Sequence, residues 1–275
     1  MKKTVIKVII AAMAVVLAVG MCVGLCACGS DNSKDLEYIK EKGTLIVGVT
    51  DYAPMDYQET EGGEWIGFDA DMAKLLGQEL GVKVEFVEID WEQKITELKS
   101  KKIDVIWNGM TVSDDLAKSM DFSYSYSTNS QVAVVKTENV GTYTTLDSMQ
   151  GAKIAVESGS AGETVAKENF DESKIVGLQG QMKALEEVFM GTSDVAIVDL
   201  TLAASKCGQG SFTDLKIVDG LRIGEEEFAV GIRKGSNLTA EVNKCLVKYY
   251  KNGKMNELRL KYGEDQIALC DLSDK

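Results

Sequence analysis

The sequence contains no histidine. This absence excludes Ser-His-Asp and Cys-His catalysis, and it excludes metal sites with histidine ligands. Proline occurs only at Pro54 and arginine only at Arg222, Arg233 and Arg259, so long polyproline linkers are absent and guanidinium groups are scarce. The 30 basic side chains are outnumbered by 43 acidic ones, and a formal charge of −13 argues against nucleic acid or an anionic membrane surface as a partner.

The rest of the composition is that of a globular protein. The 275 residues are enough for one large domain or two of moderate size, and 45% of them are hydrophobic. No Cys-x-x-Cys spacing is present, and we expect neither a metal nor a cofactor. Cys245 lies on the apolar face of a predicted helix, which indicates a core residue. The sequence does not decide whether Cys207 and Cys270 form a disulfide, because spacing alone cannot place two thiols within bonding distance.

The first residues have the pattern of an export signal. Three lysines within the first seven positions precede the apolar run Val8–Leu25. This run is just long enough to span a membrane, so a transmembrane anchor is the alternative. The Leu-x-Ala-Cys sequence that ends at Cys28 resembles the lipobox of bacterial lipoproteins. That resemblance implies removal of residues 1–27, lipidation of Cys28 and an extracytoplasmic protein anchored to the outer face of the membrane. Residues 28–43 would form a tether and a short helix.

The stretch Ile103–Ser123 combines a strand, a glycine turn and a helix start. An apolar strand is followed by Asn108-Gly109, and Thr111 or Ser113 can cap the next helix. Backbone N–H groups at such a turn favour an anion, and α/β sheets bind ligands at the carboxyl ends of their strands. The turn therefore predicts a small-ligand site that includes Asn108. The alternative is an ordinary connection without a ligand.

The order of strand, polar loop and helix recurs in both halves of the chain. It predicts parallel sheets with right-handed crossovers, and hence an α/β fold with two similar lobes. Near the end, strands are predicted at 215–218 and 228–233 with the acidic run 225–227 between them, followed by one or two helices over 238–262. Polar or aromatic residues that follow predicted strands are Asp51, Tyr52, Trp91, Asn108, Glu157, Ser160 and Asp199.

The most distinctive sequence motifs are GTLIVGVTD at 43–51, the Pro54 loop, IGFDADMA at 66–73, the turn 109–111, the triplet 121–123 and GIRKG at 231–235. Together they resemble the extracellular solute-binding proteins of bacterial ATP-driven importers, specifically the polar amino-acid group. The resemblance covers Gly43–Gly263. It implies a two-lobe, type II periplasmic-binding-protein-like fold with the ligand in a cleft between the lobes.

The resemblance also implies where the lobes begin and end. Residues 44–126 and 229–275 would form the first lobe and residues 131–224 the second. The chain would cross between them on hinge strands near 126–130 and 224–228. We expect a monomer that hands its ligand to the permease subunits of the importer.

In the first lobe, the resemblance implies that Asp51 and Tyr52 line one wall of the cleft and that Trp91 flanks the ligand on the other side. Gly109 would offer a backbone group, and Thr111 a hydroxyl and its N–H. Charge-assisted hydrogen bonds and aromatic faces suit a charged ligand that loses its water. The alternative for both aromatic residues is ordinary packing.

In the second lobe, the resemblance implies that Glu157 faces the ligand side chain, that Ser160 binds the α-carboxylate and that Asp199 binds the α-ammonium. The alternative for Asp199 is a helix N-cap. Family members usually carry an arginine seven residues after the turn glycine, which clamps the α-carboxylate. Here that position is Leu116. The carboxylate would depend on Thr111 and Ser160, or the ligand would lack one, and the net negative pocket favours a cation.

Two classes of function remain open. The first is a binding protein that captures a polar, cationic amino acid or an amine for an importer; a ligand-sensing lipoprotein differs from it only in its partner. The second is an enzyme, because the same fold resembles cyclohexadienyl dehydratases, in which a carboxylate acts as general acid. Glu157 could fill that role. A dicarboxylate substrate needs cationic groups that this cleft lacks, so we expect a binding protein without catalytic residues.

Overall fold

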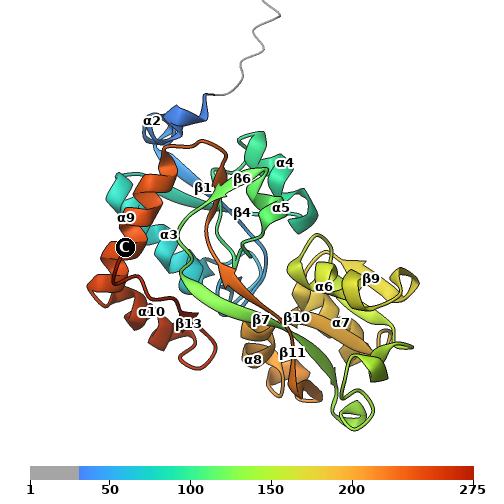
Figure 1. Ribbon diagram of the computed structural model, residues 1–275. Helices are drawn as coiled ribbons and strands as arrows, with labels where there is room; N and C mark the ends of the chain where they lie inside the picture. Colours follow the sequence, from blue (N-terminus) through green and yellow to red (C-terminus); the bar gives the residue numbers. More distant parts are fainter. Residues whose placement is uncertain (1–30) are drawn as a thin grey trace, which may run out of the picture. The chain divides into compact units, whose positions relative to one another are not determined.

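The computed structural model describes residues 31–275, and the predicted signal segment and Cys28 lie outside this range. Within it, no helix is both long and apolar enough to cross a membrane. The described chain builds two larger sheets with helices packed against them (Figure 1). This arrangement confirms the predicted α/β fold with two lobes.

The first lobe is built around a five-stranded sheet. Its elements are α2 (Asp35–Lys42), β1 (Thr44–Val49), β2 (Tyr57–Gln58), β3 (Trp65–Ile66), α3 (Phe68–Leu80), β4 (Lys83–Glu88), α4 (Lys94–Lys99), β5 (Val105–Ile106), α5 (Asp114–Ala117), β6 (Met120–Phe122), β12 (Gly231–Arg233), α9 (Leu238–Lys251) and α10 (Lys254–Tyr262). The strand order is β4-β1-β5-β12-β6. Strands β1, β4 and β5 run parallel, and β12 is antiparallel to both of its neighbours. Helix α5 begins at Ser113, whose hydroxyl accepts from the Leu116 N–H, so Ser113 is the cap.

The second lobe is built around the sheet β11-β7-β10-β8-β9, with β13 paired to β7. Its elements are β7 (Ser127–Lys136), β8 (Ile154–Glu157), α6 (Ala161–Asn169), β9 (Ile175–Leu178), α7 (Gln181–Met190), β10 (Val195–Asp199), α8 (Leu200–Lys206), β11 (Leu215–Phe228) and β13 (Ala268–Leu269). In Figure 1, α6 and α7 lie beside β8 and β10, and α8 lies beside β7. Short 3-10 turns cover Asn32–Lys34, Trp91–Gln93, Thr137–Asn139, Asp147–Met149, Glu172–Lys174 and Gly210–Phe212.

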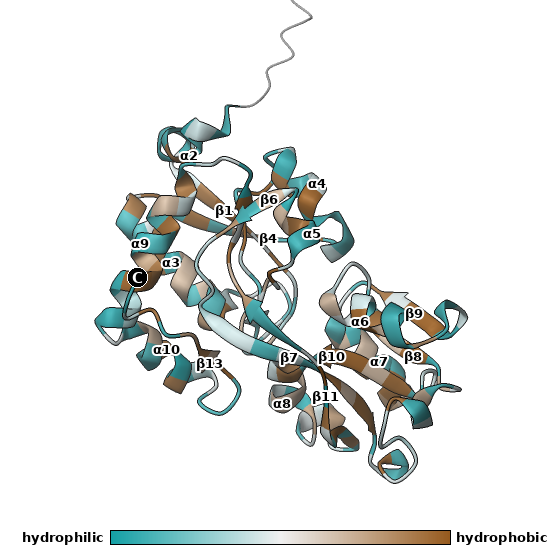
Figure 2. Cartoon of the chain, viewed as in Figure 1, coloured by the Kyte–Doolittle hydropathy of each residue, from teal (hydrophilic) through white to brown (hydrophobic). Residues whose placement is uncertain are grey.

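Burial on both faces explains the apolar strands. All five residues of β10 are buried, because α7 and α8 pack on one of its faces, α6 packs on the other, and it lies between β7 and β8. Figure 2 shows hydrophobic residues on these central strands and hydrophilic ones on the exposed parts of the helices. Cys245 is buried in α9, as predicted. Cys207, Cys245 and Cys270 are free thiols, so the disulfide left open by the sequence is not formed.

The prediction of separate strands at 215–218 and 228–233 is wrong. Strand β11 continues through the acidic run to Phe228, and β12 begins at Gly231. Glu225, Glu226 and Glu227 pair with Ser130, Asn129 and Thr128 of β7, whose own start lies at Ser127. Pairing with the long strand β7 outweighs the low strand preference of three glutamates. Between Ile217 and Gly224 the register of the two strands shifts, which marks bulges in the pairing. Glu226 thereby lies within a strand of the second sheet and not in a stretch between two strands.

Candidate functional site

A small cavity lies where strand ends of the two lobes meet. Its free volume is about 10 Å³, which is room for about one water molecule, so a larger ligand can enter only if the walls separate. The cavity contains every residue predicted for the ligand site except Asp51 and Leu116. Its lining comprises Tyr52, Trp91, Asn108, Gly109, Thr111, Glu157, Ser160, Ala161, Gln181 and Asp199.

Asp51 and Leu116 lie elsewhere. Asp51 is exposed, whereas the next residue, Tyr52, is buried and lines the cavity. Adjacent residues beyond a strand end point to different sides, so both could not enter the same cavity. Leu116 lies in an adjoining groove of about 430 Å³, together with Thr111 and Ser160, which border both spaces.

Strand ends position the two acidic residues of the second lobe. Glu157 is the last residue of β8 and Asp199 the last of β10, and these strands are parallel neighbours. Their side chains therefore emerge at the same edge of the sheet. Asp199 occupies the N-cap position of α8, but its side chain makes no cap hydrogen bond. Instead, Gln181 Nε2 donates to Asp199 Oδ2 at 2.8 Å and Gln181 Oε1 accepts from the Asp199 N–H at 2.8 Å.

A third carboxylate, which the sequence did not predict, borders the same place. Glu226 accepts from Thr111 Oγ1 at 2.7 Å and from Gln131 Nε2 at 2.8 Å, and it is also hydrogen-bonded to Asn129. Gln131 Nε2 also donates to Asp199, so one amide joins Asp199 to Glu226. The only available signal was the acidic run between two predicted strands, and glutamates are normally solvated.

The three carboxyl groups are held away from water. Burial, with a further contribution from Asp199, raises the pKa of Glu157 to about 8, and Lys94 opposes this shift. Burial followed by the nearby Asp199 likewise raises the pKa of Glu226 to about 8. Burial also raises the pKa of Asp199. A positive charge placed among these groups would favour their ionised forms.

The turn after β5 holds protein carboxylates rather than facing an anionic ligand. The Gly109 N–H donates to Asp69 Oδ2 at 2.7 Å, and Asn108 Nδ2 donates to Asp56 Oδ2 at 2.8 Å. The Gly109 N–H is therefore already engaged by a buried aspartate of the protein, although Gly109 itself lines the cavity. Gly109 has φ +56°, and a Cβ there would lie 2.4 Å from the Tyr52 ring, so only glycine fits.

Lys94 links the two lobes and was also missed. Its Nζ donates to the Gly159 carbonyl of the second lobe at 2.7 Å and to the Trp91 carbonyl at 3.1 Å. It also lies 4.9 Å from the centre of the Trp91 ring. Burial lowers the pKa of Lys94 to about 8, against the opposing effect of Glu157. A lysine on a short predicted helix is normally solvent-exposed, so this contact could not be predicted from the residue pattern.

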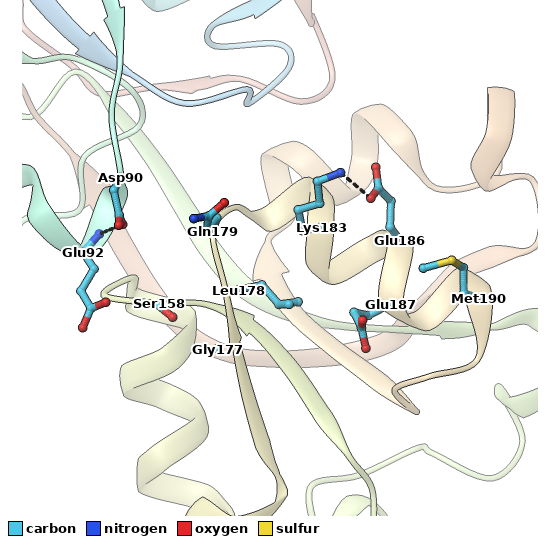
Figure 3. Close-up of a pocket in the computed structure, with 10 residues that line it drawn as sticks. All are labelled: Asp90, Glu92, Ser158, Gly177, Leu178, Gln179, Lys183, Glu186, Glu187 and Met190. Atoms are coloured by element: carbon cyan, nitrogen blue, oxygen red, sulfur yellow. Dashed lines mark hydrogen bonds and ion pairs between the residues drawn. The ribbon is translucent and has the colours of Figure 1, made fainter.

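A second groove, of about 520 Å³, adjoins the cavity on the Trp91 side (Figure 3). Asp90 and Glu92, the neighbours of Trp91, face α7 across it, and on α7 Lys183 forms an ion pair with Glu186. Glu187 adds another carboxylate to this lining. The acidic groups outnumber the single lysine here, so the groove would attract a cation toward the cleft.

A closed cavity between two α/β lobes, with polar residues delivered by strand ends, defines a solute-binding protein of the type II periplasmic class. The particular family follows from comparison with known proteins. Residues 45–265 match the family model of the bacterial extracellular solute-binding proteins, family 3. The chain belongs to this family and is a solute-binding protein of the polar amino-acid importer type, which acts outside the cytoplasm.

Three similar proteins illustrate the relationship. The L-cystine-binding protein TcyJ of Escherichia coli (strain K12) is 30% identical over 229 residues, which are 82% of this chain and 85% of TcyJ. The arginine-binding extracellular protein ArtP of Bacillus subtilis (strain 168) is 31% identical over 245 residues, 86% of this chain and 91% of ArtP. The crystal structure of the ancestral amino acid-binding protein AncCDT-1, a precursor of cyclohexadienyl dehydratase, has a TM-score of 0.74 and 33% identity, and covers 82% of this chain and 98% of that one.

Proposed function

We propose that this protein captures a small cationic amino acid or amine in the interlobe cavity and delivers it to the permease subunits of an ABC importer. The observation that carries the proposal is that Glu157 and Asp199 both line the buried cavity, and that Gln131 joins Asp199 to Glu226, a half-buried carboxylate of the adjoining groove. Buried carboxylates need a positive partner, and a cationic ligand supplies one. Arginine as the ligand of the relative ArtP agrees with this charge.

We further propose that the protein binds without catalysis. A general acid at Glu157 would require a substrate whose leaving group lies beside it, and the dicarboxylate of a dehydratase would meet Asp199 and Glu226 instead of cations. The described arginines are placed elsewhere: Arg233 is buried between Asp35 and Asp104, at 2.8 and 3.2 Å.

The lobes would open and close on the segments near 126–130 and 224–228. The observations that support this hinge are the tiny cavity and the few direct bonds across the cleft. They include Lys94 to the Gly159 carbonyl, Ser205 Oγ to the Ala53 carbonyl at 2.9 Å, Thr201 Oγ1 to the Gln266 carbonyl at 3.1 Å and Thr111 Oγ1 to Glu226. Hinged closure commonly uses a few residues at the ends of elements.

A thermal-shift scan tests the proposed ligand class. A ligand that binds only the folded protein raises its melting temperature, by an amount that grows with ligand concentration over Kd. We expect lysine, arginine, ornithine or their amines to raise the melting temperature, and glutamate and aspartate to leave it unchanged. Stabilisation by the acidic amino acids alone would refute the proposal.

We also propose that Cys28 is the lipidated first residue of the mature protein, anchored to the outer face of the membrane. The support is the lipobox-like sequence before Cys28. We expect mass spectrometry of the mature N-terminus to show a diacylglycerol-modified Cys28, and Cys28→Ser to leave the membrane fraction or to remain unprocessed. An unmodified Cys28 in the wild type would contradict the anchor.

A further inference from the structure

The hydroxyl groups predicted to bind a ligand carboxylate are already used inside the protein. Thr111 Oγ1 donates to Glu226 Oε2 at 2.7 Å. Ser160 Oγ donates to the Glu157 carbonyl at 2.7 Å and accepts from the Glu163 N–H at 3.1 Å as the cap of α6. A ligand carboxylate at this place would have to displace a protein acceptor from each hydroxyl.

The amide donors around the cavity are engaged as well. Gln131 Nε2 donates to both Asp199 and Glu226, and Gln181 Nε2 donates to Asp199 at 2.8 Å. Asn108 Nδ2 donates to the Thr50 carbonyl at 3.1 Å and to Asp56 at 2.8 Å. These side-chain donors all point to acceptors of the protein itself.

Three buried polar atoms around the cavity have no hydrogen-bond partner: the Tyr52 hydroxyl, which can donate or accept, and two oxygens that can only accept. Glu157 Oε1 and Gln131 Oε1 have no hydrogen-bond partner, although these residues are only 3% and 2% exposed. A buried acceptor without a donor is costly, so such atoms call for a ligand that brings N–H groups. Gln131 bridges Asp199 and Glu226, whereas Glu157 ends the neighbouring strand β8. The cavity at Glu157 and the adjoining groove at Gln131 and Glu226 are therefore two acidic places for N–H groups.

The charge beside Thr111 is negative and would repel the carboxylate of a ligand. Glu226 brings its own carboxylate to Thr111, and the nearby Leu116 supplies no positive charge. A second carboxylate beside Glu226 would be repelled, whereas an amine would be attracted both to Glu226 and to Asp199.

We propose that the ligand carries two cationic nitrogen groups and no carboxylate, as a decarboxylated basic amino acid does, and that Glu226 is the residue that rejects a carboxylate. This inference rests on the proposed function, which requires only that the ligand be cationic. The Glu226 carboxylate lies beside the Thr111 hydroxyl, where the carboxylate of an amino-acid ligand would otherwise bind. It sets specificity by repulsion as well as by attraction.

Calorimetry with matched ligand pairs tests this proposal: arginine against agmatine, lysine against cadaverine, and ornithine against putrescine. For the wild type, we expect at least one amine to bind about tenfold or more tightly than its parent amino acid. Glu226→Gln keeps the shape and removes the charge, and should reduce that preference by about tenfold or more. Its control is Glu227→Gln, the exposed neighbour in the same strand that does not line the groove, which should leave the preference unchanged.

The outcomes separate the two proposals. If the amino acids bind as tightly as their amines, Glu226 does not exclude a carboxylate and the present inference is overturned, while a cationic ligand still stands. If neither member of any pair binds but a neutral or acidic amino acid does, the proposed function itself fails. Leu116→Arg offers a second variant at a partly exposed position, and we expect it to weaken amine binding by introducing a positive charge into the groove that contains Glu226. Unchanged or tighter amine binding would contradict the inference.

Discussion

Replacing Glu157 by glutamine is expected to weaken binding of a cationic ligand by about 2–5 kcal/mol, at least about 30-fold in Kd. The side chain is 3% exposed and its Oε1 has no partner in the protein, so the ligand would be its main donor. The amide retains the size of the carboxylate, removes its charge and replaces one acceptor oxygen by an NH2 donor. Titration calorimetry measures the difference, and Glu172→Gln, an exposed site in the same lobe, is the matched control. Equal affinities for wild type and Glu157→Gln would exclude Glu157 from the binding site.

The same site gives the binding reaction a defined pH dependence. Burial raises the pKa of Glu157 and of Glu226 to about 8, so at pH 6–7 the free site holds protons that a bound cation would expel. Burial lowers the pKa of Lys94 to about 8, and its deprotonation would also favour a cationic ligand, so the sign is the same. Affinity should therefore rise from pH 6 to pH 8, with proton release seen as a buffer-dependent enthalpy. Glu157→Gln should show a smaller rise, carried by Glu226, Asp199 and Lys94. Proton uptake on binding would contradict this scheme.

Substituting alanine for Gly159 is expected to prevent full closure of the cleft and to weaken binding by about 1–3 kcal/mol. A Cβ at Gly159 would lie 2.9 Å from the Cα of Glu92, which belongs to the other lobe. Because that neighbour is backbone, it cannot turn aside as a flexible side chain could. The Lys94 bond to the Gly159 carbonyl would be stretched at the same time.

Gly235 supplies a matched control for this variant. Both glycines have φ +73°, but a Cβ at Gly235 would meet nothing within 4 Å. Each alanine should cost about 1–2 kcal/mol of folding stability through its left-handed backbone, as measured by denaturant unfolding. Only Gly159→Ala should lose affinity. Small-angle scattering should show that saturating ligand shrinks the wild type and Gly235→Ala more than it shrinks Gly159→Ala. Equal shrinkage and equal affinity in both variants would exclude contact at Gly159 as part of closure.

Local sequence determined the strands, the loops that follow them and most of the cavity lining. Apolar runs such as the one before Asp199 need burial on both faces, and the carboxyl end of a parallel strand delivers the next polar residue to the site edge. Tyr52, Trp91, Glu157 and Asp199 could therefore be predicted one strand at a time. The scarcity of arginine and the excess of acidic residues, likewise visible in the composition, indicated a negative pocket.

The tertiary structure alone decided which groups meet across the cleft. Glu226 reaches Thr111, 115 positions away in sequence, only because β11 extends along β7, and Lys94 reaches Gly159 only because two lobes approach each other. Such contacts cannot be read from a single sequence, because a contact between distant residues does not alter the hydrophobic pattern around either of them. The sequence could show that carboxylates lie near the site. The fold decided that the donors near the site, such as the Thr111 hydroxyl and the Gln131 amide, already bind these carboxylates. Each polar atom pairs with the partner that the folded chain places within about 3 Å of it.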